Sequence, residues 1–252
     1  SYLKNMHLYG FGRLRGAPVF FSLPTARPEQ FLYVNHPPTL FWIQFAIVEA
    51  FGLSERTLRV FPAVATAVGH GLLGAALLRS AGLRVAIAAV AILFVDRMSF
   101  VFGWMAGYEG PVLCAMIGAA WANEKRIDCG KGRMKVAAFI AMATAVDWAG
   151  SFILPALMVG ESLRPKAVRR FGDFVPAAIG VGLVVLADIA WVIWVRGGPS
   201  AAIQAFRAAA ADANALGEAS RGAWFLALWA NLRLGHGDVL LGAAAPAVLW
   251  NI

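Results

Sequence analysis

Two carboxylates occupy positions where an apolar chain could use them for acid–base chemistry. Glu109 follows Tyr108 at the start of one apolar stretch, and Asp147 lies within another. An ionisable group in or beside a membrane span is costly, and it usually faces a cavity or a charged partner. A positioned carboxylate can accept a proton from a reacting hydroxyl, so both residues are candidate catalytic groups. Either could instead cap a helix start, where exposed N–H groups favour an acidic oxygen.

Three basic side chains are candidates for binding a phosphate. His36 directly precedes Pro37 and Pro38. Two prolines at a helix start fix φ and remove no intrahelical hydrogen bond, so they direct His36 away from that helix. Arg59 and Arg97 carry guanidinium groups, which stay charged and bind oxyanions through two parallel hydrogen bonds. The alternative for each arginine is to extend its charged head toward an interface.

The remaining polar residues are weaker candidates for a site. Asp188 and Glu49 lie inside apolar stretches, where either could be protonated or paired within a helical bundle. The sequence contains no phosphate-binding glycine loop, dinucleotide fingerprint or zinc signature. Cys114 and Cys129 have no metal-ligating neighbours at a useful spacing. The residues themselves therefore assign no metal ligand and no cofactor.

Composition indicates that these residues are carried by membrane helices. Of the 252 residues, 60% are hydrophobic and only 14% are charged, and the mean hydropathy is +0.68. An ordinary globular chain is about half apolar and a quarter charged, so this chain has too few charges to cover a surface that faces water. No run shows the alternation of a membrane β-barrel strand. The sequence therefore predicts an all-α, polytopic transmembrane helical bundle.

The distribution of basic residues predicts an orientation rather than a nucleic-acid partner. The net charge is +8, and half of the 22 Lys and Arg fall in short segments between apolar runs, within 79–84, 123–135 and 161–173. Basic clusters of this kind mark cytoplasmic loops. We therefore expect 123–135 and 161–173 on the cytoplasmic side of the plasma (inner) membrane. Segments 1–36, 96–109 and 197–222 are then outside, with the candidate acids on the extracytoplasmic face.

The lengths of the apolar runs predict the organisation of the chain. About 20 residues are needed to cross the hydrocarbon layer. Segments 58–78, 85–95, 110–122 and 175–195 are expected to cross, whereas 38–53 is short and is expected to dip in. Both flanks of 136–160 are basic, which favours two short helices that meet near Asp147. One membrane-embedded domain, 1–252, then comprises an outer loop (1–36), a transmembrane core (37–195), an outer loop with interfacial helices (196–236) and the start of a further span (237–252).

An ordered series of landmarks runs along residues 2–165. The first landmark is a His-Pro-Pro segment (His36, Pro37 and Pro38), and the second is a Phe-Gly turn (Phe51 and Gly52). An arginine followed by a proline comes next (Arg59 and Pro62). The last is an Arg-Met step followed by an acid (Arg97, Met98 and Glu109). This order resembles the polyprenyl-phosphate-sugar-dependent glycosyltransferases of the GT-C fold. That family includes protein O-mannosyltransferases and the aminoarabinose transferases of lipid A.

The resemblance implies transfer of a sugar from a polyprenyl-phosphate carrier to a lipid, glycan or protein acceptor outside the cytoplasm. It implies catalytic roles for Glu109 and Asp147 and donor-phosphate binding by His36, Arg59 and Arg97, with a divalent metal ion as the one cofactor that the family chemistry allows. The expected partners are the lipid-linked donor and membrane lipids, and the oligomeric state stays open. The family's Asp-Glu pair would lie before the first residue, so we expect a chain truncated at both ends and inactive alone.

A multi-pass transporter is the alternative function. Broken helices and acids inside the membrane, such as Asp147 and Asp188, also suit a coupled ion site. Internal inverted repeats would favour a transporter, and none is visible in the sequence. A non-catalytic membrane scaffold is the third interpretation, and it would need no acid at position 109.

Overall fold

The computed structural model describes residues 2–19, 32–34, 36–95 and 107–204, and these residues form an all-α structure. Its α-helices are α1 (Tyr2–Tyr9), α2 (Thr39–Phe51), α3 (Glu55–Ser80), α4 (Leu83–Val95), α6 (Glu109–Cys129), α7 (Arg133–Val146), α8 (Ile153–Ser162) and α9 (Val175–Arg196). Short 3-10 helices follow α7 and α8, namely η2 (Trp148–Phe152), η3 (Lys166–Val168) and η4 (Phe171–Phe174).

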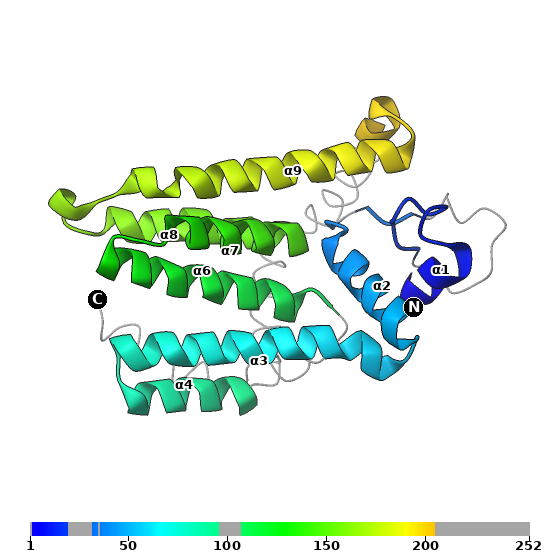
Figure 1. Cartoon of the computed structure of the whole chain (residues 1–252). Coiled ribbons are helices and arrows are strands. Elements are labelled where there is room, and N and C mark those ends of the chain that lie inside the picture. The colour runs from blue at the N-terminus through cyan, green and yellow to red at the C-terminus, as the bar shows by residue number, and fades with distance from the viewer. Residues whose placement is uncertain (1, 20–31, 35, 96–106, 205–252) are drawn as a thin grey trace, which may run out of the picture.

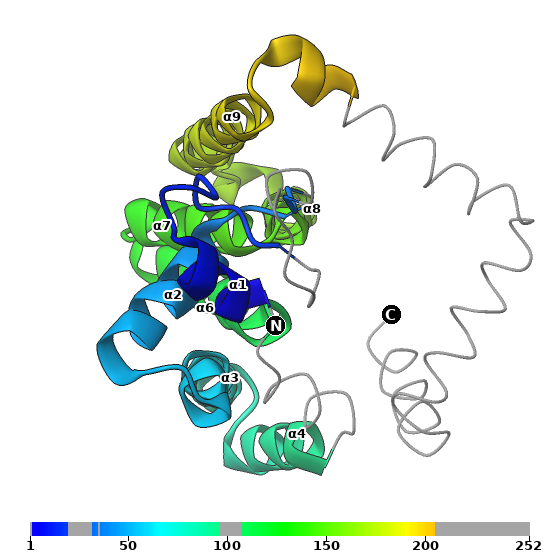
Figure 2. The ribbon, with the colours of Figure 1, turned by 90° about the vertical axis from the view of Figure 1, so that its right-hand side faces the viewer.

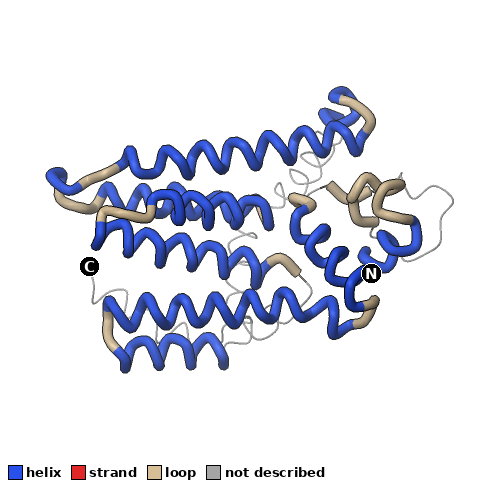
Figure 3. The backbone as a smooth tube through the Cα atoms, viewed as in Figure 1, coloured by secondary structure: helices blue, strands red, loops and turns tan. Residues whose placement is uncertain are grey.

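Five helices form the body of the molecule. α4, α3, α6, α7 and α9 pack against one another in that order, as Figure 1 shows. The described loops gather at the two ends of this bundle (Figure 3). α1 and α2 lie across one end, in front of α6 and α7 when the bundle is viewed along its axis (Figure 2). Among the described residues, one end of the bundle is covered by the N-terminal segment. The other, formed by the turns that follow α3, α6 and α8, has no such cover in the described part of the chain, and we call it the bare end.

Helix lengths agree with the expectation for 58–78, 175–195 and 38–53, but not for all the expected spans, since α4 has only 13 residues and α6 is not among the candidate membrane-crossing helices of the described residues. α3 and the stretch Phe171–Arg196, which contains α9, are long and apolar enough to cross a membrane. At 1.5 Å per residue, the 26 residues of α3 extend about 39 Å, which exceeds the roughly 30 Å of a hydrocarbon core. The 13 residues of α2 extend only about 20 Å, so this helix is too short to span, as its sequence predicts.

The junction between α2 and α3 follows from local chemistry. α2 ends at Gly52, whose φ of 82° is readily adopted only by glycine. α3 then begins after Ser54, whose hydroxyl accepts a hydrogen bond from the Thr57 N–H. A serine cap of this kind contributes about 1 kcal/mol to helix stability. The two helices therefore separate at a defined turn rather than continuing as one rod.

The structure corrects the expected basic loop at 123–135. α6 continues to Cys129 and α7 begins at Arg133, so only residues 130–132 form the turn. Long-chain basic residues are good helix formers, and nothing in this segment breaks the helix before Gly130, where φ is 66°. The expected loop at 161–173 is likewise part helical, since it contains the end of α8 together with η3 and most of η4.

The two short helices expected within 136–160 are confirmed. α7 ends at Val146, η2 turns the chain, and α8 runs from Ile153. Gly150 permits this turn, because a Cβ at that position would clash with the backbone carbonyl of Ala143 on α7. Asp147 stands at the point where α7 ends and η2 begins.

The N-terminal segment is more folded than the expected outer loop. It contains α1, and Leu3, Met6 and Leu14 are almost completely buried against α2 and the end of α9. Two indoles hold it in place. Trp42 on α2 donates to the Gly16 carbonyl at 2.9 Å, and Trp191 on α9 donates to the Arg15 carbonyl at 3.1 Å. The gain from burying apolar side chains explains why this Gly- and Pro-containing segment packs as a cap.

The C-terminal expectations fall mostly outside the described residues. Residues 199–204 are helical, which covers the start of the surface helix expected at 200–222. The remainder of that helix and the span expected at 237–252 lie outside the described residues.

Candidate functional site

The covered end of the bundle brings together a histidine, a carboxylate and two tyrosines. Nδ1 of His36 lies 3.0 Å from Oδ2 of Asp147, although the two residues are 111 positions apart. The His36 ring stacks on Tyr108 with 4.4 Å between ring centroids and on Tyr33 with 5.7 Å. We call these four residues the His36 cluster. They come from the segment before α2, the turn before α6 and the end of α7.

Local sequence positions the imidazole. Pro37 and Pro38 directly precede the first residue of α2, and no side chain caps this helix start. The residue before a proline is disfavoured in the helical region, so α2 does not extend back through Pro37 to His36. The ring instead leaves the helix and inserts between the two tyrosines, where 23% of its side chain stays exposed. His36 is therefore held on three sides and remains accessible.

Asp147 is both a helix cap and a partner for His36. Its Oδ1 accepts the Ala149 N–H at 2.8 Å, which caps η2, while Oδ2 faces the imidazole. The helix-cap interpretation is thus confirmed, and the catalytic role of Asp147 stays a prediction. Only 8% of the side chain is exposed. Burial opposes ionisation, but the hydrogen bonds from His36 and Ala149 and the attraction to His36 outweigh it, and the pKa of Asp147 lies below its ordinary value.

The two tyrosines are held in their neutral form. Burial raises the pKa of Tyr33, and the nearby Tyr108 and Asp147 raise it further. Burial also raises the pKa of Tyr108, with added effects from Glu109 and Asp147. Neutral phenols can donate a hydrogen bond but carry no charge that would compete with Asp147 for the imidazole. Sequence analysis named Tyr108 only as the residue before Glu109 and assigned no role to Tyr33.

The pairing of His36 with Asp147 defines what the imidazole can do. An ionised carboxylate accepts hydrogen bonds only, so Nδ1 carries the hydrogen in this pair. Among the described residues, Nε2 has no hydrogen-bond partner. A carboxylate that orients one ring nitrogen leaves the other to exchange a proton or to bind an anion. The cluster is therefore equipped for acid–base chemistry or for oxyanion binding.

Glu109 lies beside the cluster. It is the first residue of α6, where the helix dipole favours a negative charge. Its carboxylate folds back over Gly107, where a side chain would clash with it, and it lies close enough to Tyr108 to raise the pKa of that phenol. No hydrogen bond joins Glu109 to His36 or Asp147 among the described residues. The structure thus brings this candidate acid to the same end of the bundle without a direct contact.

Of the two candidate arginines, Arg59 is described, and it does not join the cluster. Arg59 is half exposed and pairs with Glu55 one turn earlier on α3 at 2.5 Å. Arg97 lies outside the described residues. Glu49, a weaker candidate, is not inside the bundle, because it is about half exposed and pairs with His7 at 2.8 Å. Asp188 is buried in α9 with 7% exposed.

A second ionic cluster, at the bare end, was missed by sequence analysis. Arg126 on α6 is 1% exposed and binds Glu161 at 2.6 Å, Asp173 at 2.8 Å and the Asn123 amide oxygen at 2.9 Å. Glu161 is equally buried and also accepts the backbone N–H of Arg170. Burial opposes its ionisation, but hydrogen bonds from Arg126, Arg170 and Arg164 lower the pKa of Glu161. Each guanidinium nitrogen of Arg126 already donates to one of these three partners, and the side chain is 1% exposed, so we interpret the cluster as structural.

The expected metal assistance has no ligand set in the described part of the chain. No group of three or more His, Cys, Asp or Glu side chains gathers there to hold a metal ion. His36 and Asp147 supply two donor side chains that already bind each other. A catalytic site usually supplies three protein ligands, so we derive no step through a metal.

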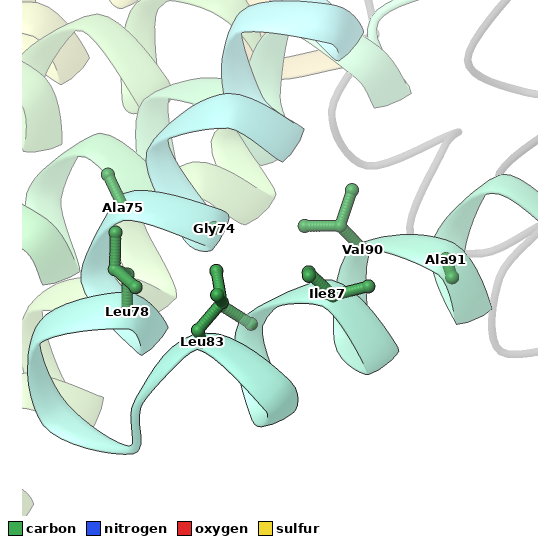
Figure 4. Close-up of a pocket in the computed structure, with 8 residues that line it drawn as sticks. Gly74, Ala75, Leu78, Leu83, Ile87, Val90 and Ala91 are labelled. Carbon is green, nitrogen blue, oxygen red and sulfur yellow. The ribbon is translucent and has the colours of Figure 1, made fainter.

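An apolar groove of about 430 Å³ lies between α3 and α4 (Figure 4). Its lining consists only of glycine and aliphatic side chains, namely Gly74, Ala75, Leu78, Leu83, Ala86, Ile87, Val90 and Ala91. Without a polar group, the groove can perform no acid–base chemistry. The His36 cluster therefore remains the candidate site.

Comparison of the chain with protein-family models, with curated proteins and with solved structures finds no match. The functional argument therefore depends on the ordered landmarks of the sequence and on the geometry of the His36 cluster.

Proposed function

We propose that the chain is an integral-membrane glycosyltransferase of the GT-C type. It would transfer a sugar from a polyprenyl-phosphate carrier to an acceptor outside the cytoplasm. The observation that supports this most directly is the His36–Asp147 pair, 3.0 Å apart at the covered end of the bundle. Half of the 22 Lys and Arg lie at the other end, in its turns and in the helix ends beside them (Figure 1). The positive-inside rule then assigns the His36 cluster to the extracytoplasmic face of the plasma membrane.

Exposed apolar faces support the membrane part of this proposal. On α3, Val60, Val64 and Val68 are each at least half exposed at a spacing of four residues. On α9, the exposed large apolar side chains are Val175, Ile179, Leu183, Leu186 and Trp194. Contiguous apolar faces of this kind are unfavourable in water and mark contacts with a membrane or a partner. Lipid chains would cover them without any further protein.

In the proposed reaction, His36 and Asp147 act on the leaving phosphate and Glu109 acts on the acceptor. The acceptor oxygen attacks the anomeric carbon, a new C–O bond forms, and the C–O bond to the carrier phosphate breaks. The electron pair of that bond leaves with the polyprenyl phosphate, to which Nε2–H of a protonated His36 donates a hydrogen bond. Asp147 holds the ring through Nδ1. Glu109 takes the proton of the acceptor hydroxyl, the role typical of a positioned carboxylate.

Arg59 and Arg97 are proposed as additional phosphate ligands. Arg59 lies at the start of α3, on the same end of the bundle as the His36 cluster (Figure 1). Its partner Glu55 is 76% exposed, so little energy is needed to exchange this surface pair for a phosphate contact.

Binding of polyprenyl phosphate tests the role of His36. We expect His36→Gln to weaken binding of this lipid to the purified full chain by about 10- to 100-fold, the range for losing one hydrogen bond to a charged group. His7→Gln is the matched control, because His7 also pairs with a carboxylate but lies outside the cluster. Equal binding by the parent and His36→Gln would remove His36 from the proposed donor site.

A transporter remains the second candidate, because of Asp188. In the described structure Oδ2 of this buried carboxylate has no hydrogen-bond partner. A lone acid inside an apolar helix is expected to hold a proton or to face an ion path. Transport would be favoured over sugar transfer if vesicles that contain the chain take up a solute when a proton gradient is applied. This uptake should be lost in Asp188→Asn and retained in His36→Gln.

A further inference from the structure

Two adjoining cavities open at the turn between α6 and α7. One has a volume of about 220 Å³ and is bordered by Lys125, Lys131 and Lys135, and the other has about 490 Å³ and is bordered by residues 130–135 and Asp173. They share Lys131, Gly132 and Lys135. We call the two together the α6–α7 cavity. It lies at the bare end of the bundle, opposite the His36 cluster (Figure 1).

The charge around this cavity is positive and largely uncompensated. Lys125 places its Nζ over the Trp121 ring at 3.9 Å, and Lys131, Arg133 and Lys135 form no ion pair among the described residues. The bordering acid is Asp173, whose Oδ2 is already bound by Arg126 at 2.8 Å. A guanidinium nitrogen of a further basic residue, Arg170, lies against Gly130.

The start of α7 adds to this positive charge. Its first turn contains no acidic residue, and no side chain caps it. Arg133 and Lys135 occupy that turn instead, although the dipole disfavours cations at a helix N-terminus. The positive end of the α7 dipole and the basic side chains of the cavity wall thus repel one another, and a bound anion would relieve this repulsion.

We propose that the α6–α7 cavity binds the phosphate of an anionic phospholipid headgroup. An apolar side chain at the rim favours a lipid over a free phosphate ion, because Met134 borders the cavity with 65% of its surface exposed. Basic pockets at the cytoplasmic ends of membrane helices recognise anionic headgroups in this way. The inference depends on the membrane location in the proposed function but not on sugar transfer.

Thermal unfolding of the purified full chain in a neutral detergent tests this site. We expect short-chain phosphatidylglycerol to raise the unfolding temperature and phosphatidylcholine of equal chain length to leave it unchanged. The double variant Lys131→Gln/Lys135→Gln should need about 30-fold more phosphatidylglycerol for the same shift, from about fivefold for each basic residue near an anionic lipid.

The control variant is Arg84→Gln/Lys166→Gln, which removes two exposed charges outside the cavity. It should respond to phosphatidylglycerol as the parent does. Equal weakening in both double variants would show general surface attraction and overturn the site. An equal shift with inorganic phosphate would overturn the lipid assignment, and no shift in the parent would overturn the proposal. Because the assay does not measure glycosyl transfer, its failure is distinct from failure of the proposed enzyme function.

Discussion

Removing the buried arginine at the bare end should destabilise the protein more than any exposed charge does. In Arg126→Met, Glu161 would lose the 2.6 Å bond from its fully buried partner and would retain the Arg170 N–H and the partly exposed Arg164. Breaking a buried ion pair by removing one partner costs about 3–5 kcal/mol. The retained bonds place the expected loss of unfolding free energy near the lower end, about 3 kcal/mol.

The assay is denaturant unfolding of the purified chain in detergent, with Arg79→Met as the matched control. Arg79 pairs with Asp128 across α3 and α6 at 2.9 Å, but both side chains are about half exposed. Exposed pairs contribute about 0–1 kcal/mol. The double variant Arg126→Met/Glu161→Met should recover most of the lost stability, because no buried charge is left unpaired.

The pH dependence provides an independent measure of the same cluster. The pKa of Glu161 is lower in the folded protein than its ordinary value of 4.5. The stability that ionised Glu161 contributes to the folded protein is therefore complete above pH 4.5, and it is lost as the pH falls through the lowered folded-state pKa. In Arg126→Met this acid-side loss should shrink. A loss of stability no larger in Arg126→Met than in Arg79→Met, or an unchanged acid-side slope, would refute the structural role of the cluster.

Three further predictions concern the orientation, the proposed chemistry and the turn at Asp147. Native Cys129, which is exposed, should be labelled from the cytoplasmic side. A cysteine introduced as Ser200→Cys in a Cys129→Ser chain should be labelled from the outside. Labelling of both positions from one side would disprove the orientation. If the proposed sugar transfer is correct, Glu109→Gln should lower its turnover by about 10²- to 10⁴-fold with near-normal membrane insertion, whereas near-native turnover would identify Glu109 as a helix cap. Gly150→Ala should lower unfolding stability by about 1–3 kcal/mol or more because of the clash with Ala143, whereas Gly160→Ala, which meets no neighbour, should not.

Residue patterns in the sequence determined most of the helices. Apolar runs and their lengths predicted α3, α4, α6 and α9, and basic flanks predicted that 136–160 would divide into two short helices, as α7, η2 and α8 do. The Pro-Pro step and Gly52 predicted where α2 begins and ends. These features are local, since helix formation depends on residues within a few turns of each other.

Side-chain partners required the tertiary structure. His36 and Asp147 meet because α2 and the segment before it lie across the ends of α6 and α7, and no local pattern encodes a contact over 111 positions. Arg126 likewise shows that the sequence does not reveal which charged side chains are buried. The sequence predicted it in a basic loop, yet packing of α6 against α8 buries it with Glu161, and Asp173 of η4 pairs with it. The sign of a charge is local information, whereas its burial depends on which helices pack around it.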